Sequence, residues 1–349
     1  MSGRFQQSDF WCGFKCAHGW NRVTADGVNV LVRSFRKAFI RFSLAYIPLA
    51  PERGAGEGDE AYVARIGSLS ARLRPLLPPD TLCIRYDIPL DFADCAGRDS
   101  FVAGVPSLAR GAGVRLVKSM VDIQPPDSTF LDLSRTEDEL LAAMKSKWRY
   151  NVRYAARHGV EVRAVRAGSP DFDRDVDSFY SLYETTAARD GIGLHPKSYY
   201  RDLLERGAGD GGSDPAGRTL TTLYLASHEG EDLAAIITLF QSGEAVYLYG
   251  CSGNSKRNLM PAYLVQWTAI RDAKAFGSRV YDFYGMPPTD DESHPMHGLY
   301  LFKTGFGGSS VHRPGSFDVP LSPLYRLYTL AERARALWHK KIVKKLRGR

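Results

Sequence analysis

The sequence of 349 residues lacks an apolar run long enough to span a lipid bilayer. Its first residues, MSGRFQQSDFW, lack the hydrophobic core of a secretory signal. The cysteines lack the paired spacing of a metal site. We therefore expect a cytoplasmic protein with reduced thiols. The five cysteines are Cys12, Cys16, Cys83, Cys95 and Cys251.

Two further patterns are incomplete. The glycine-rich stretch 207–217 has no phosphate-loop spacing, so we interpret it as a surface loop. His294 and His297 have no third candidate ligand nearby, so the sequence predicts no metal site. The composition, 44% hydrophobic and 24% charged, is ordinary for a globular protein. The length predicts two domains.

The positive charge is concentrated at one end. The chain carries a formal charge of +7, and residues 331–349, with eight Lys or Arg and one Glu, account for all of it. Apolar residues such as Leu337, Trp338 and Leu346 give this basic tail a second, apolar side. The tail fits contact with anionic lipid or with tRNA phosphates, and the alternative is a solvated terminal helix.

The order of periodic segments predicts a mixed α/β chain. Residues 136–139 (TEDE) form a capping box, and the pattern after them predicts one helix to about 158, with Gly159 as its C-cap. Strands are expected at 221–227, 233–240 and 245–250, a helix at 261–276 and a strand at 279–283. Strand, loop, helix and strand over 245–283 are typical of an acetyltransferase-like (GNAT) unit.

Residues 20–125 show a comparable order of elements. We therefore predict an α/β (α+β) protein with two tandem GNAT-like domains. The expected domains are 1–125 together with about 308–349, and 126–307. No pair of long, charge-rich heptad helices interrupts 170–220, so we expect no coiled-coil arm.

The segment 281–315 carries the strongest chemical signal. In GLYLFKTGFGG (298–308), Lys303 stands among aromatic residues and glycines. Apolar neighbours strip water from a lysine, and a desolvated, fixed cation is suited to stabilising a developing oxyanion. The alternative is a buried strand from which Lys303 reaches the surface.

This segment resembles the C-terminal signature of the Fem-type (FemABX) peptidoglycan-bridge aminoacyltransferases. The matching elements are the YDF strand, the "G-L--FK--FGG" block and Gly315-Ser316-Phe317-Asp318. The opening QSDFW with Lys15 and Gly19-Trp20, and KSKWRYNVRYAARHGVEV (145–162), resemble two other family motifs. The resemblance covers about residues 5–335, and the order of the motifs makes it specific.

The resemblance implies a monomeric enzyme that moves an amino acid from aminoacyl-tRNA to a side-chain amine of a peptidoglycan precursor, lipid-linked or UDP-linked. It implies no metal, ATP or other cofactor. Lys303 would stabilise the oxyanion with Phe302 packed beside it. Asp87 would orient the incoming amine or hold a sugar hydroxyl; its alternative is a turn-forming role before Ile88-Pro89.

The resemblance also places acceptor-binding residues. Basic residues of the first hairpin would contact the acceptor's diphosphate, although charged residues also suit any half-exposed hairpin. His195 stands where the family often has arginine, and a neutral histidine holds phosphate less well. Core packing is the alternative for the tyrosines, of which Tyr247 is expected to share a strand face with Tyr249. The predicted set is Arg33, Arg36, Lys37, His195, Tyr199, Tyr247 and Tyr249.

Four basic residues recur every fourth position on the helix expected to end at about 158, a stripe suited to tRNA or simply to solvent. They are Lys145, Arg149, Arg153 and Arg157.

The coenzyme A loop of acetyltransferases is degraded at 255–262, where Met260 replaces a glycine and Pro261 lacks an amide. The rival functions are a coenzyme A-dependent N-acyltransferase and a non-catalytic tRNA- or membrane-binding protein. We expect a cytoplasmic enzyme, peripheral at the inner face of the plasma membrane if the basic tail binds lipid.

Overall fold

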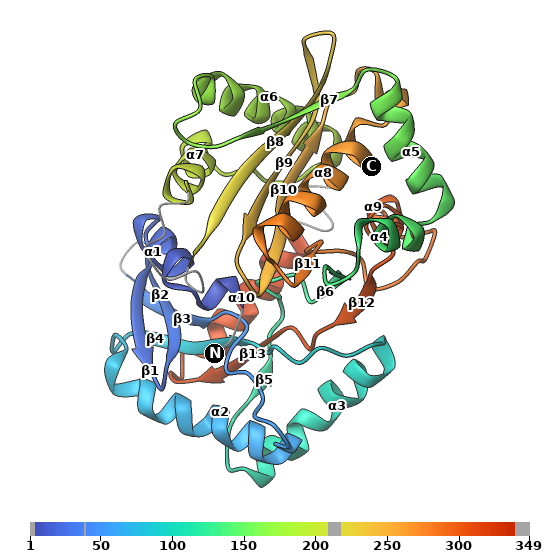
Figure 1. The fold of residues 1–349 in the computed structure, drawn as a ribbon. Coiled ribbons are helices and arrows are strands. Elements are labelled where there is room, and N and C mark those ends of the chain that lie inside the picture. The colour runs from blue at the N-terminus through green and yellow to red at the C-terminus, as the bar shows by residue number, and fades with distance from the viewer. Residues whose placement is uncertain (1–3, 38–39, 209–217, 339–349) are drawn as a thin grey trace. The chain divides into compact units, whose positions relative to one another are not determined.

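The computed structural model describes residues 4–37, 40–208 and 218–338 (Figure 1). Most of the glycine-rich stretch and residues 339–349 of the basic tail lie outside the described residues. The described chain divides into two compact units. Unit 1 consists of residues 4–5 and 127–311, and unit 2 of residues 6–126 and 312–338.

Unit 1 is built on a sheet of strand order β12-β6-β11-β10-β9-β8-β7. Its strands are β6 (Asp127–Asp132), β7 (Glu161–Val165), β8 (Leu220–His228), β9 (Glu231–Phe240), β10 (Glu244–Ser252), β11 (Val280–Asp282) and β12 (Ser309–His312). Its helices are α4 (Glu137–Ala143), α5 (Ser146–Arg157), α6 (Phe172–Asp190), α7 (Lys197–Arg206), α8 (Pro261–Phe276) and α9 (His297–Thr304).

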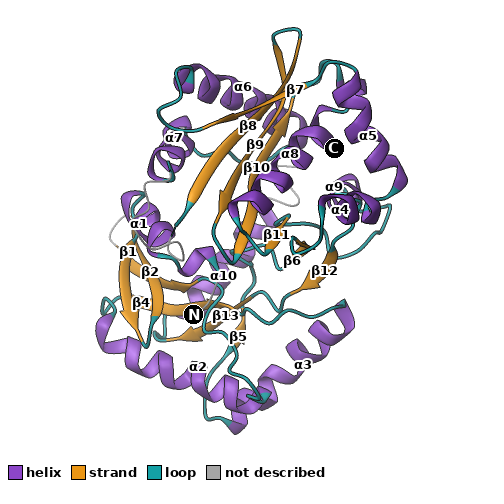
Figure 2. Ribbon diagram, in the orientation of Figure 1, coloured by secondary structure: helices purple, strands orange, loops and turns teal. Residues whose placement is uncertain are grey.

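Helices cover both faces of this sheet, as Figure 2 shows. Helices α6 and α7 pack on β8, β9 and β10, and α8 packs on β8 and β9 with α5 beside it. Strands β8, β9 and β10 are antiparallel, whereas β10 and β11 are parallel and are joined through α8. A parallel pair requires such a crossover. This arrangement confirms the predicted GNAT-like, mixed α/β fold.

Unit 2 contains a sheet of order β1-β2-β3-β4-β13-β5. Its strands are β1 (Asn21–Ala25), β2 (Val28–Lys37), β3 (Ile40–Ile47), β4 (Thr81–Asp87), β5 (Val117–Lys118) and β13 (Ser316–Pro320). Its helices are α1 (Asp9–Ala17), α2 (Asp59–Leu73), α3 (Cys95–Gly111) and α10 (Tyr325–Trp338).

Strand β4 has apolar side chains on one face of this sheet and charged side chains on the other. Its alternate side chains Ile84 and Tyr86 join the apolar core formed with α2 and α3. Arg85 and Asp87 point to the opposite face because side chains alternate along a strand. Helix α10 lies against this second face, where Tyr325 donates a 2.9 Å hydrogen bond to Asp318.

The helix predicted over 136–158 is wrong as a single element, because the chain forms α4 and α5 with a break at Met144 and Lys145. Both residues have extended ψ angles, 146° and 142°. The capping box at Thr136 is confirmed. No glycine or proline marks the break, but tertiary hydrogen bonds hold it: the Lys145 amide donates to the Gly305 carbonyl at 2.9 Å.

Two further observations concern long helices. Within the described residues, no helix is both long and apolar enough to cross a membrane. The described residues between α6 and β8 contain the ten-residue helix α7, in agreement with a chain that lacks a coiled-coil arm.

Candidate active site

A cavity of about 680 Å³ opens in unit 1 beside the N-terminal half of α8. We call it the α8 cavity. Residues of α6, β9, β10, the loop before α8, α8 itself and α9 line it. Apolar surface predominates in its lining. Lining residues used below are Tyr247, Gly250, Arg257, Met260, Gln266 and Phe302.

Gln266 is a polar side chain in the apolar wall of the cavity. It is fully buried, and its Nε2 donates a 2.6 Å hydrogen bond to the Tyr281 hydroxyl. Its Oε1 has no hydrogen-bond partner within the described residues. A buried acceptor without a donor costs about 1–3 kcal/mol. Gln266 is therefore a lining residue whose acceptor oxygen is buried behind the cavity surface.

The loop before α8 does not form an open phosphate cradle. Lys256 and Met260 adopt left-handed φ angles of 44° and 59°. The Leu259 amide donates to the Lys256 carbonyl at 2.9 Å, and the Met260 amide donates to the Arg257 carbonyl at 3.1 Å. These two amides are used within the loop, which agrees with the expected weak fit to a coenzyme A pyrophosphate.

Lys303 lies in helix α9 rather than in a strand, and its side chain is 5% exposed. Its ammonium donates hydrogen bonds to three successive carbonyls, those of Phe283 (2.7 Å), Tyr284 and Gly285 (2.7 Å). Burial lowers the pKa of Lys303 to about 7, and Asp282 opposes this shift. The alternative of a strand lysine that reaches the surface is therefore wrong.

The three carbonyls converge because the chain turns sharply at Tyr284 and Gly285. Their φ angles of 50° and 34° are left-handed, a conformation that costs a non-glycine residue about 1–2 kcal/mol. The Asp282 carboxylate helps to hold the turn by accepting a 2.7 Å hydrogen bond from the Tyr284 amide. The Lys303 ammonium is thus held in place by the carbonyls of a strained turn.

Phe302 and Lys303 belong to the same helix but contact different surroundings. Phe302 lines the α8 cavity and packs edge-to-face against Tyr263 at 5.3 Å. Lys303 contacts the turn at 283–285, and its Nζ lies 5.0 Å from the centre of the Tyr247 ring. Tyr247 therefore connects the buried lysine with the cavity wall.

Tyr247 and Tyr249 do not share a strand face, which corrects the sequence analysis. The pairing of β10 with β9 shifts by one residue between them, at a β-bulge. A bulge reverses the alternation of side chains. Tyr247 consequently packs toward Lys303 and the cavity, whereas Tyr249 packs against Tyr200 at 5.1 Å. Gly250 makes room for the Tyr247 hydroxyl.

Three predicted acceptor residues lie together: His195 just before α7, Tyr199 on α7 and Tyr249 on β10. The His195 ring stacks on Tyr199 at 4.0 Å. Tyr199 shares a side-chain hydrogen bond with Tyr249, and burial raises the pKa of both phenols. The structure therefore brings His195, Tyr199 and Tyr249 together and separates them from Tyr247.

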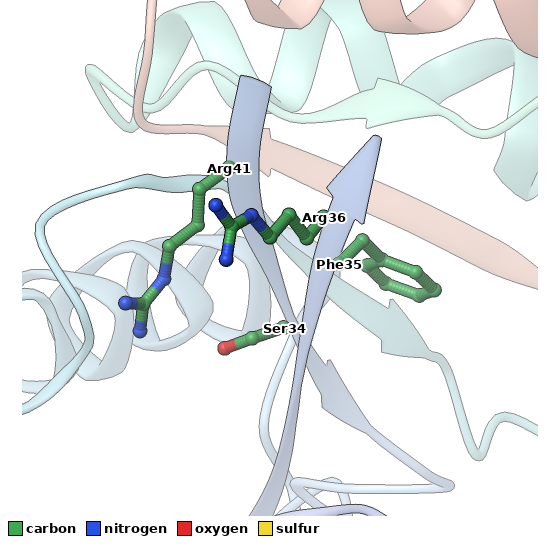
Figure 3. Close-up of a pocket in the computed structure, with 4 residues that line it drawn as sticks. All are labelled: Ser34, Phe35, Arg36 and Arg41. Atoms are coloured by element: carbon green, nitrogen blue, oxygen red, sulfur yellow. The ribbon is translucent and has the colours of Figure 1, made fainter. Parts of the chain in front are cut away.

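The basic residues of the first hairpin in unit 2 are divided by the alternation of β2. Arg33 lies over the Trp20 and Phe35 rings, at 5.5 and 5.6 Å. Arg36 points to the opposite face and lines a hollow of about 520 Å³ together with Arg41 (Figure 3). The side chain of Lys37, at the end of β2, lies outside the described residues.

Arg41 was missed by the sequence analysis. It stands directly opposite Arg36 in the β2–β3 register, and two like charges in that position repel each other. Arg41 is partly neutralised by Asp80, whose carboxylate lies 3.1 Å away. An anion in this hollow would relieve the repulsion. The register of a hairpin was the signal that could have identified this pair.

Asp87 ends β4 and is 1% exposed. The hydroxyls of Tyr46 and Ser316 donate hydrogen bonds to its two carboxylate oxygens. Burial raises the pKa of Asp87 to about 6 even though both hydroxyls favour the charged form. The residue is a buried carboxyl held from two strands, β3 and β13, which is more than a turn-forming role requires.

The basic stripe on α5 is divided between structural and exposed residues. Arg149 donates to the carbonyls of Leu141, Ala142 and Met144 at 3.1–3.2 Å and so caps α4. Lys145 lies over the Trp148 ring at 5.8 Å. Arg153 and Arg157 are exposed and, within the described residues, form no ion pair.

Aromatic side chains accompany the two exposed arginines. Tyr150 is 55% exposed and lies 5.7 Å from Tyr154, which stacks on His158 at 3.8 Å. Exposed rings beside arginines are typical of surfaces that bind single-stranded nucleic acid. The C-terminal half of the predicted stripe, Arg153 and Arg157, therefore keeps the properties of a nucleic-acid surface.

Comparison with known proteins gives consistent matches. The sequence model of the FemAB family matches residues 113–207 and 220–333, more than half of the chain. Two relatives named lipid II:glycine glycyltransferase are each 24% identical. The Staphylococcus epidermidis protein aligns over 65% of this chain and 66% of its own length, and the Staphylococcus aureus protein over 59% and 61%.

The chain thus spans about two thirds or less of the length of these relatives. Among solved structures, the crystal structure of FemX superposes with a TM-score of 0.72 at 19% sequence identity. The match covers 94% of this chain and 95% of the FemX chain. At this identity the likeness establishes a shared fold.

Proposed function

The chain belongs to the FemAB family, and we propose that it is an aminoacyltransferase that extends the stem peptide of a peptidoglycan precursor. The amino acid would come from aminoacyl-tRNA and would be joined to a side-chain amine of the precursor. The relatives named for lipid II support a lipid-linked acceptor over a nucleotide-linked one. We expect the enzyme to act as a monomer in the cytoplasm.

The reaction makes an amide from an ester. The acceptor nitrogen attacks the ester carbonyl, the amine gives up a proton, the bond to the ribose oxygen breaks, and that oxygen gains a proton. Because the ester is already activated, the step consumes no ATP and calls for no metal ion. The protein would contribute positioning and stabilisation of the tetrahedral oxyanion.

The single observation that carries the proposal is the position of Lys303. A buried cation lies on the Tyr247 ring, and that ring lines a cavity large enough for an aminoacyl group. In the structure all three ammonium protons go to carbonyls. Lys303 would therefore act on the oxyanion by its charge, or by exchanging one carbonyl for the substrate oxygen.

We assign the remaining site residues to contacts with the donor, the tRNA or the acceptor, first in unit 1 and then in unit 2. In unit 1, Gln266 would accept a hydrogen bond from the donor in the α8 cavity, and Arg153 and Arg157 would contact tRNA phosphates. In unit 2, Asp87 would orient the acceptor amine, and the hollow beside Arg36 and Arg41 would hold the acceptor's diphosphate. The basic tail would contact lipid or tRNA.

The rival function is a coenzyme A-dependent N-acyltransferase. A binding test separates the two: thermal shift of the full chain with acetyl-CoA, and with tRNA carrying an amino acid through a stable amide at its 3′ end. Stabilisation by the charged tRNA analogue and none by acetyl-CoA supports the proposal. The reverse pattern would favour the acyltransferase.

A further inference from the structure

Helix α10 presents an unusual number of exposed apolar side chains. Scattered exposed leucines are ordinary, but a contiguous group is not. The group comprises Leu324, directly before the helix, and Leu327, Leu330, Leu337 and Trp338 within it, which are 51%, 63%, 59%, 56% and 58% exposed. We call it the outer face of α10, because at 100° per residue these positions fall on one side of the helix.

The opposite side of α10 is fixed to unit 2, so the outer face cannot turn inward. Arg85 is 5% exposed and donates to both carboxylate oxygens of Asp318, at 2.7 and 2.8 Å. It also donates to Glu332 of α10 at 3.0 and 3.1 Å. Tyr325 and Tyr328 complete this contact through hydrogen bonds to Asp318 and Glu332.

Positive charge borders the outer face. The exposed arginines Arg326 and Arg333 lie along one border, and Arg335 lies along the other. At the start of the helix, Arg326 and Arg115 line a hollow of about 410 Å³. Within the described residues, none of these four guanidinium groups has a carboxylate partner. The surface thus combines apolar side chains with cations that are available to an anion.

We propose that the outer face of α10 binds the surface of a membrane that contains anionic lipids. The leucines and Trp338 would enter the boundary between headgroups and acyl chains, where an indole ring is favoured. The bordering arginines would contact lipid phosphates, with one headgroup in the hollow of Arg115 and Arg326.

Charge and polarity favour a membrane over other partners. A nucleic-acid backbone would pair with the arginines but would leave five large apolar side chains in water. A second copy of the chain could cover the leucines but would bring arginines of like charge together along both borders. An anionic bilayer offers an apolar layer and phosphates at the depths that this face requires.

The test uses the full chain and sedimentation with vesicles of phosphatidylcholine, with and without phosphatidylglycerol. We expect binding to the anionic vesicles only. The double variant L327E/L330E should lower the affinity at least about tenfold, because two leucines lose their apolar burial. The matched control is Leu76→Glu, which charges a leucine of unit 2 that is 52% exposed but distant from α10 in sequence. It should bind like the wild type.

Two further measurements test contact of the outer face and its bordering arginines with lipid. Brominated lipids should quench the fluorescence of Trp338, as judged by comparison with Trp338→Phe. The variant R115Q/R326Q should weaken binding to anionic vesicles at least about threefold if a headgroup occupies the hollow. Binding only through the residues that follow Trp338 would be abolished by salt and would be unchanged in L327S/L330S, which removes the same leucines without adding charge.

Three results would overturn the proposal. One is equal vesicle binding by the wild type and L327E/L330E when both have the same melting temperature. Another is a wild type that fails to bind anionic vesicles. The third is a wild-type dimer in light scattering that L327E/L330E converts to a monomer without any vesicle binding, which would assign the face to a second copy.

Discussion

The ammonium nitrogen of Lys303 lies 5.0 Å from the centre of the Tyr247 ring. One side chain is a buried cation, and the other lines the α8 cavity. A cation close to an aromatic face is stabilised by the ring electrons. In the proposed function, their contact would let a charge that is shielded from water act near a ligand in the cavity.

Lys303→Met should reduce aminoacyl transfer by at least about 10²-fold, the size of effect expected when one oxyanion-stabilising group is lost. The same variant leaves three carbonyls without this donor, and each should lower the free energy of unfolding by about 1–3 kcal/mol where it stays buried. Turnover and thermal melting should therefore be measured on the same preparation.

The matched control is Lys274→Met on α8, which removes a lysine that donates to a single carbonyl, that of Leu133, at 2.9 Å. We expect this variant to melt slightly lower and to turn over normally. If Lys303→Met remains folded and transfers at a near-normal rate, Lys303 has no part in the chemistry.

Gln266→Leu should weaken binding of the aminoacyl donor. The substitution keeps the side-chain volume but removes the Oε1 acceptor in the wall of the α8 cavity, and a lost hydrogen bond of about 1.4 kcal/mol raises KM about tenfold. KM for the donor is the measurement. Tyr281→Phe removes the other partner of Gln266 and should lower stability without raising KM; an equal rise in both variants would indicate general disturbance of the wall.

The arginines of α5 divide into two that we expect to contact tRNA, Arg153 and Arg157, and one that caps α4, Arg149. R153Q/R157Q should weaken tRNA binding and make the slope of log K against log salt shallower by about 1.4–1.8, the value for two phosphate contacts. Arg149→Gln should leave tRNA affinity unchanged and lower the melting temperature, because Arg149 caps α4. Equal tRNA affinity of R153Q/R157Q and the wild type would remove α5 from the interface.

The buried carboxyl of Asp87 predicts a pH-dependent stability. Burial raises its pKa from 3.8 to about 6 in the folded state. Between about pH 4 and pH 6 the folded state therefore binds more protons than the unfolded state, and stability falls as pH rises through this window. The loss amounts to about 2–3 kcal/mol at 1.36 kcal/mol per pKa unit.

Asp87→Asn removes this titration. Its free energy of unfolding should change less than that of the wild type between pH 4 and pH 6, as measured by urea denaturation at each pH. Parallel pH profiles for the two proteins would show that the carboxyl does not titrate as its burial implies.

Much of the fold could be predicted from local signals. The capping box at Thr136 and the helix over 261–276 depend on local sequence, and both were identified correctly. The break at Met144 and Lys145 could not be predicted, because it is held by the hydrogen bond that the Lys145 amide donates to the Gly305 carbonyl, far away in the sequence. Tertiary contacts override helical periodicity there.

The candidate site was predicted unevenly for similar reasons. A bulge with no marker in the sequence separates Tyr247 from Tyr249. Lys303 was identified from its apolar neighbours, but its carbonyl partners depend on the turn at Tyr284. Gln266 gave a signal that was missed: it is a polar residue on the apolar side of the helix predicted at 261–276.

The most direct test of the proposed function is transfer of a radiolabelled amino acid. The purified full chain would be mixed with a pool of charged tRNAs and with lipid-linked or nucleotide-linked muropeptides that carry different diamino residues. The account predicts label on a muropeptide that disappears when the tRNA is first digested with RNase. Absence of transfer to every acceptor, or transfer that survives RNase treatment, would contradict it.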